Sequence, residues 1–144
     1  MPKASEKKWP IVYENYMATY NEAQKIATKD YGRYENGPNA ADLLLGTVQF
    51  VPLYKNYNTS IKHNQVINMF CQYDYGCDGK QYTSYDAFWN ALNIIQGSID
   101  PGSTIAFPKN IGCCRGGANW AVISNMIEVV LGKDYEVFIY SLEE

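Results

Sequence analysis

The stretch TIAFPKNIGCCRGGANW, residues 104–120, decides the fold class of this chain. It begins with a short apolar run, residues 104–107, that is typical of a buried strand, and continues through a glycine-rich loop, residues 108–118. Asn119 is a good N-cap for a helix whose apolar side chains recur at helical spacing: Trp120, Ile123, Ile127 and Val130. Residues 135–142 then form a second apolar run. This order predicts two parallel strands joined by a right-handed helical crossover.

The residues before this stretch add further elements of both kinds. Helical spacing predicts a helix over residues 16–31, and apolar runs predict strands over 46–54 and 65–71. Ser84 is expected to cap a second helix that ends at Gly97 and has one apolar face: Tyr85, Phe88, Trp89, Leu92 and Ile95. We therefore expect a single α/β domain over residues 1–144, with residues 1–15 as a lead segment. Its mixed, mainly parallel central sheet should carry helices on both faces.

Composition excludes several classes of protein. The chain has 144 residues, of which 47% are hydrophobic and 19% charged, as in a globular domain. Its 12 basic and 15 acidic residues give a net charge of −3, so we expect no duplex nucleic-acid partner. No apolar run is long enough for a membrane span, and the first residues lack the apolar core of a signal peptide. Four cysteines without a CxxC pair indicate reduced thiols and a cytoplasmic location.

The glycine-rich loop is the best candidate for a ligand site. It follows the C-terminal end of a strand, where α/β sheets bind their ligands. Gly112, Gly116 and Gly117 allow backbone N–H groups to turn toward an anion, and Arg115 can hold a phosphate with two hydrogen bonds. The same glycines also suit a simple turn from strand to helix. Residue spacing alone favours the simple turn over a diphosphate cradle.

The loop resembles the second phosphate loop of macro domains, and most closely the small form found in bacteriophage and bacteria. That form includes ADP-ribose-1''-phosphate phosphatases, and its loop reads roughly fPxxIGcGlaGGdW. The matching residues here are Phe107-Pro108, Ile111-Gly112-Cys113, Gly116-Gly117 and Trp120. Further segments match in order upstream: Leu45-Gly46, Val66–Gly76 and Ser84–Ala87. The resemblance covers about residues 20–142. If the chain comes from a virus, the expected location is the cytoplasm of the host.

The resemblance implies a binding site for ADP-ribose or a related nucleotide, with neither metal nor cofactor. The loop residues that would hold the diphosphate are Ile111, Gly112, Cys113, Cys114, Arg115, Gly116, Gly117, Ala118 and Asn119. Four more residues would border the ligand: Pro108, Gln72, Tyr73 and Tyr75. Packing alone accounts equally well for the two tyrosines.

Departures from the family pattern argue against efficient catalysis. Cys114 and Ala118 stand where the pattern has glycine, Arg115 replaces an apolar residue, and Asn119 replaces an aspartate. Asparagine cannot accept a proton at neutral pH, so a catalytic acid is lost. The chain also shows neither the family's opening strand with its aspartate nor its first Asn-containing ligand loop. We therefore expect a degenerate macro-like domain that binds its ligand with little or no turnover.

Other functions stay open at this point. A phosphatase or ADP-ribosyl hydrolase is one alternative, and an interaction or structural protein with a protein partner or a homo-oligomeric assembly is another. Cys113 before a helix could act as a nucleophile with His63, but no motif places the two side by side. The spacing of Cys71, Cys77, Cys113 and Cys114 does not suit zinc.

Overall fold

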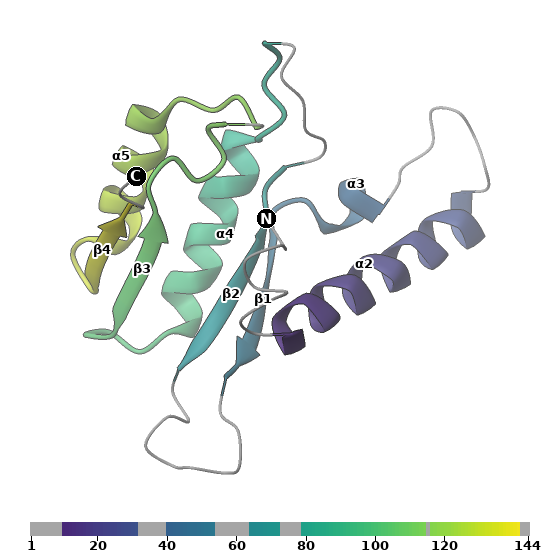
Figure 1. Ribbon diagram of the computed structural model, residues 1–144, viewed down its shortest axis with the longest axis horizontal. Helices are drawn as coiled ribbons and strands as arrows, with labels where there is room; N and C mark the ends of the chain where they lie inside the picture. The colour runs from purple at the N-terminus through teal and green to yellow at the C-terminus, as the bar shows by residue number, and fades with distance from the viewer. Residues whose placement is uncertain (1–9, 32–39, 54–63, 73–78, 115, 142–144) are drawn as a thin grey trace. The chain divides into compact units, whose positions relative to one another are not determined.

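The described residues belong to two units of the chain. The computed structural model describes residues 10–31, 40–53, 64–72, 79–114 and 116–141 (Figure 1). One unit comprises residues 1–44 and 48–69, and the other comprises residues 45–47 and 70–144. Both contain helices and strands, so the expectation of a mixed α/β chain is confirmed.

The first unit contains helix α2 (Pro10–Tyr31), helix α3 (Ala40–Leu44) and most of strands β1 (Thr47–Pro52) and β2 (Gln65–Phe70). The expected start of the first helix at Tyr16 is wrong, because α2 begins six residues earlier at Pro10. Proline suits the first position of a helix, where its missing N–H has no partner to lose. The side chains of Val12, Ala23 and Ala27 are buried. Ala40 starts α3 and donates its N–H to Gln24 Oε1 at 3.3 Å.

Strands β1 and β2 form an antiparallel pair. Gly46 N donates to Phe70 O at 2.7 Å before β1, and Leu53 N donates to Asn64 O at 3.0 Å after it. A polar network ties the pair to α2: Gln49 Nε2 donates to Asn15 O and to Thr19 Oγ1, and Gln49 Oε1 accepts from Asn68 Nδ2. Side-chain hydrogen bonds therefore hold this helix in addition to apolar packing.

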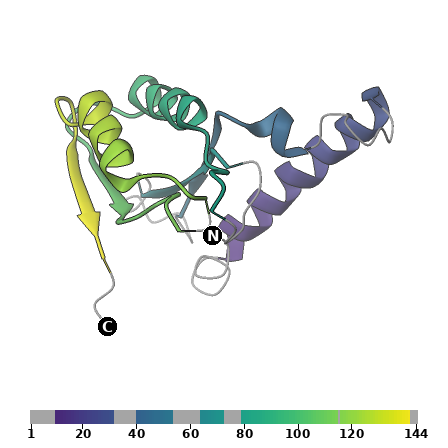
Figure 2. The ribbon, with the colours of Figure 1, turned by 90° about the horizontal axis from the view of Figure 1, so that it is seen from above.

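The second unit contains helix α4 (Tyr85–Ser98), strand β3 (Thr104–Pro108), helix α5 (Trp120–Leu131) and strand β4 (Glu136–Tyr140). Both expected caps are confirmed: Ser84 accepts the N–H of Ala87, and the Asn119 side chain accepts the N–H of Ala121. Strands β3 and β4 pair in parallel, with Thr104 opposite Glu136 and Pro108 opposite Tyr140. Helix α5 connects them as predicted, and Figure 2 shows α4 and α5 beside each other.

The core of the second unit lies between its helices and one face of β3. Its largest fully buried side chains come from α4 and α5: Phe88, Leu92, Ile95, Ile123, Ile127 and Leu131. Burial alternates along β3, where Phe107 is buried while Thr104 and Ala106 are exposed. Trp89 is 42% exposed, so its expected place on the buried face of α4 is wrong.

The expectation of one mainly parallel central sheet is also wrong for the described residues. Two separate two-stranded sheets are present, β1–β2 and β3–β4, and only the second is parallel. The reason is local: β1 and β2 are consecutive strands that pair directly, whereas β3 and β4 are joined through α5.

Candidate functional site

The candidate site is the loop from Pro108 to Asn119, which runs from the C-terminal end of β3 to the start of α5. The pairing with β4 extends into its first residues, where Lys109 N donates to Tyr140 O at 2.7 Å, and a turn follows in which Ile111 N donates to Pro108 O at 3.2 Å. Asn110 follows with a φ of 66°, a value that asparagine tolerates better than most residues. Ala118 N then donates to Gly112 O at 3.1 Å and closes the loop on itself.

Two glycines of the loop are required by geometry. Gly117 has a φ of 71°, and a Cβ there would lie 2.5 Å from Lys80 O. A Cβ on Gly116 would collide with Thr83 Oγ1 and Gly112 O, and would lie 2.8 Å from Gln72 Oε1. The backbone of the loop is therefore pressed against residues 80–83, where no side chain fits.

The segment before α4 braces the loop by hydrogen bonds. Tyr82 N and Thr83 N both donate to Gly116 O, at 2.7 and 2.9 Å. The buried Thr83 side chain donates from Oγ1 to Gly112 O at 2.8 Å. Gln72 pairs with Thr83 in a short antiparallel bridge, so the predicted ligand neighbour Gln72 does lie beside Gly116.

Four backbone N–H groups of this braced loop donate to no acceptor in the described part of the chain. They belong to Gly112, Cys114, Gly116 and Gly117. Gly112 is partly exposed, and Cys114 and Gly117 are exposed, so their N–H groups can bind water. Gly116 is buried. A buried N–H without an acceptor is rare in folded proteins, and an ordered water or a ligand normally satisfies it.

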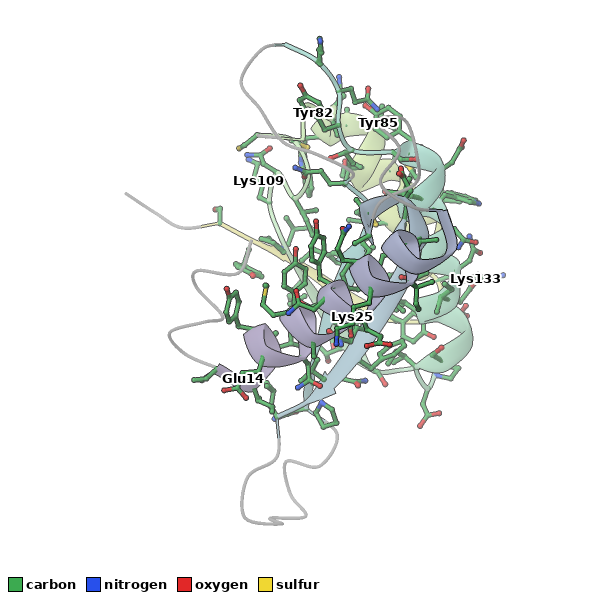
Figure 3. All side chains as sticks on the ribbon, turned by 90° about the vertical axis from the view of Figure 1, so that its right-hand side faces the viewer. Glu14, Lys25, Tyr82, Tyr85, Lys109 and Lys133 are labelled. Carbon is green, nitrogen blue, oxygen red and sulfur yellow. The ribbon has the colours of Figure 1, made fainter. Side chains whose placement is uncertain are left out.

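Two lysines belong to the segments that surround these N–H groups. Lys80 borders Gly117 through its carbonyl, and Lys109 belongs to the first turn of the loop; both are exposed. Figure 3 shows Lys109 toward the same end of the second unit as Tyr82 and Tyr85. Asp86, in the first turn of α4, is the neighbouring carboxylate on that helix. The surroundings of the loop thus combine N–H donors with two lysines, an arrangement that suits an anion.

The start of α5 carries a contact that the sequence did not suggest. Asn119 N donates to the hydroxyl oxygen of Tyr85 at 2.9 Å, across 34 residues of chain. The Asn119 side chain accepts Ala121 N at 2.8 Å and is thereby used as the helix cap. We expected Tyr85 on the apolar face of its helix, within the Ser84–Ala87 segment that resembles the family pattern, but did not expect it or Thr83 to reach the loop.

The thiols of the site are not activated. Burial, and secondarily the neighbouring Cys114, raises the pKa of Cys113. Burial raises the pKa of Cys71 to about 12. The Cys113 thiol lies 3.5 Å from Ile111 O, to which it can donate. Both groups are therefore protonated at neutral pH, which disfavours the cysteine nucleophile considered above.

Several predicted site residues lie outside the described residues: Arg115, Tyr73, Tyr75, His63 and Cys77. Of the others, the structure places Ile111, Gly112, Cys113, Cys114, Gly116, Gly117, Ala118 and Asn119 in the one loop, with Pro108 at its start. Within the described ranges, no three His, Cys, Asp or Glu side chains gather as metal ligands do. No helix of those ranges has the length and apolar character needed to cross a membrane.

Comparisons with known proteins identify a shared fold. No family model matches the chain, and no curated protein matches it. A solved structure of a protein of unknown function from Bacteroides thetaiotaomicron is similar, with a TM-score of 0.59 and 22% sequence identity. The similarity covers 96% of this chain and 75% of that one. At this identity the likeness extends to the fold alone.

Proposed function

We propose that this chain binds ADP-ribose or a related nucleotide through its diphosphate, with little or no catalysis. One observation carries the proposal: the buried Gly116 N–H, with the N–H groups of Gly112, Cys114 and Gly117, has no acceptor in the described part of the chain. Phosphate oxygens accept several such hydrogen bonds at once and are stabilised by nearby lysines. The resemblance of the loop to the phosphate loop of macro domains supports the same ligand.

The chemistry of the loop supports binding rather than turnover. Asn119 carries no acid, and its side chain is engaged in capping α5. The raised pKa of Cys113 keeps that thiol neutral, so it is a poor nucleophile. We therefore infer a binding module rather than a hydrolase.

Isothermal titration calorimetry tests this function directly. The ligands are ADP-ribose, its 1''-phosphate and adenosine, which has the base and a ribose but no phosphate. We expect heat from the first two and none from adenosine. Absence of both heat and thermal stabilisation at millimolar ADP-ribose would overturn the proposal. Release of phosphate or of ADP-ribose over time would instead identify an enzyme.

A second candidate function rests on strand β4. Phe138, Ile139 and Tyr140 are 51%, 43% and 52% exposed, and β4 pairs with β3 on one side only among the described strands. Exposed apolar edge strands pair readily with other strands. This surface favours an interaction protein that forms a homo-oligomer or binds a protein partner. Light scattering after size exclusion tests the homo-oligomer: a strict monomer at high concentration would exclude it.

A further inference from the structure

Tyr85 brings a hydroxyl group to the junction between the loop and α5. Its oxygen accepts the N–H of Asn119 at 2.9 Å. A phenol can accept and donate at the same time. The hydrogen of this hydroxyl has no acceptor in the described part of the chain. The phenol therefore accepts from the backbone and keeps its own donor available.

The position of Tyr85 is fixed from both sides. Tyr85 is the first residue of α4, held by the Ser84 cap, and Ser84 N donates to Cys71 O at 2.8 Å. On the other side, Asn119 is two residues from Gly117, one of the residues whose N–H has no acceptor. Figure 3 shows Tyr85 and Tyr82 toward the same end of the second unit, and the Tyr82 N–H braces Gly116 O. The hydroxyl is thus anchored at the start of α5, two residues along the chain from Gly117.

We propose that Tyr85 is a ligand-positioning residue, which relays hydrogen bonding from Asn119 N–H through its hydroxyl to a phosphate oxygen of the ligand. This inference rests on the proposed function and adds to it a side-chain donor from α4. A hydroxyl that accepts one hydrogen bond becomes a better donor in the next, because the bonds polarise one another. Backbone N–H groups and this O–H together form a set of donors, which selects the acceptor-only oxygens of an ionised phosphate.

The test compares Tyr85→Phe with Tyr135→Phe by calorimetry with ADP-ribose and by thermal unfolding. The first variant removes only the hydroxyl at the loop. Tyr135 is the matched control: it is buried at the far end of β4, and its hydroxyl lies 2.6 Å from Ile99 O and 2.8 Å from Gln96 O. We expect Tyr85→Phe to bind about tenfold or more weakly, as for a lost hydrogen bond to a charged group. Tyr135→Phe should lose stability and keep its affinity.

The possible results separate this proposal from the proposed function. If the wild type binds ADP-ribose and Tyr85→Phe binds it equally well, the role of Tyr85 is overturned and the proposed function stands. If Tyr85→Phe loses as much stability as affinity, with a thermal shift larger than that of Tyr135→Phe, Tyr85 is merely structural. If the wild type binds none of ADP-ribose, its 1''-phosphate or inorganic phosphate, both proposals are overturned.

A measurement on the unaltered protein covers the case in which Tyr85→Phe does not fold. The amide signal of Asn119 is followed by nuclear magnetic resonance while ADP-ribose is added to the wild type. A relay predicts that this signal shifts, although Asn119 N–H donates to Tyr85 rather than to the ligand. An unchanged Asn119 amide at saturation would overturn the relay.

Discussion

The two helices of the second unit begin in similar ways but are approached by different backbones. Ser84 caps α4 and Asn119 caps α5, each by accepting an N–H from the first turn. Before α4, the N–H groups of Tyr82, Thr83 and Ser84 are all donated to carbonyl oxygens. Before α5, four N–H groups over residues 112–117 have no acceptor in the described part of the chain.

This difference supports the proposal that the start of α5 is the ligand site. A connection that serves only the fold satisfies its own buried polar groups, as the approach to α4 does. The approach to α5 is held by Thr83 and by close contact with residues 80–83, yet four of its N–H groups have no acceptor in the described part of the chain. A rigid loop with open donors has already lost its conformational freedom before binding, which favours affinity.

The largest loss of stability and of binding should come from adding a side chain at Gly116. In Gly116→Ala the new Cβ collides with Thr83 Oγ1 and Gly112 O, so the loop must move and the hydrogen bonds to Gly116 O weaken. We expect a loss of about 2–3 kcal/mol of stability and no measurable binding of ADP-ribose by calorimetry. Gly97→Ala is the control, because nothing lies within 4 Å of that position in α4. It should gain about 0.5–1 kcal/mol and bind normally; equal behaviour of the two variants would contradict the account.

A smaller loss of stability and affinity is expected when the hydrogen bond from Thr83 to Gly112 O is removed by a substitution that keeps the shape of the side chain. Thr83→Val deletes the hydroxyl that donates to Gly112 O, while that carbonyl still accepts from Ala118 N. Denaturant unfolding should show a loss of about 1 kcal/mol, and binding should weaken several-fold. Thr104→Val is the control, since its hydroxyl makes an exposed 3.3 Å contact with Glu136 Oε2. It should change stability by under about 0.5 kcal/mol and leave affinity alone.

Substitutions of the two N-cap residues test whether the starts of α4 and α5 differ in function as well as in backbone hydrogen bonding. Ser84→Ala and Asn119→Ala should each cost about 1 kcal/mol of stability. Asn119→Asp keeps a good cap and carries the aspartate of the resembled family pattern, so its stability and its affinity for ADP-ribose should both hold. Asn119→Ala should also weaken binding, because it loosens the helix start that follows the loop; an equal loss of affinity in Ser84→Ala would place the ligand away from α5.

The cysteines should affect the stability of the fold least at neutral pH and more under alkaline conditions. Cys114 is exposed and should be alkylated first, Cys113 more slowly, and the buried Cys71 only after unfolding. The pKa of Cys71 rises from 9.0 to about 12 on folding, so the folded state holds the proton more tightly. This contribution to stability is complete below pH 9 and is lost as the pH rises toward 12. Unfolding measured at pH 8 and pH 10.5 should therefore show a smaller alkaline loss in Cys71→Ala than in the wild type.

Local signals in the sequence predicted much of the second unit. Ser84 and Asn119 were recognised as caps because a cap depends on residues only a few positions apart. The strands β1 to β4 were found from their apolar runs, with ends within a few residues of those observed. Pro10 was placed in a lead segment, although proline is common in the first turn of a helix.

Long-range pairing could not be predicted in the same way. The antiparallel pairing of β1 with β2 and the division into two sheets depend on contacts between distant residues. The site shows the same limit: its glycines were found as a motif, but Thr83 and Tyr85 reach the loop across 29 and 34 residues. Tyr85 lies in the Ser84–Ala87 segment that resembles the family pattern, but no local signal shows that either residue reaches the loop.

The most direct test of the central claim is to follow backbone amide signals while ADP-ribose is added. We predict that the amides of Gly112, Cys114, Gly116 and Gly117 shift strongly as they gain phosphate acceptors. The already bonded amides of Tyr82, Thr83 and Ser84 should move little. No shift in the four loop amides at millimolar ADP-ribose, or shifts centred on another part of the chain, would contradict the account.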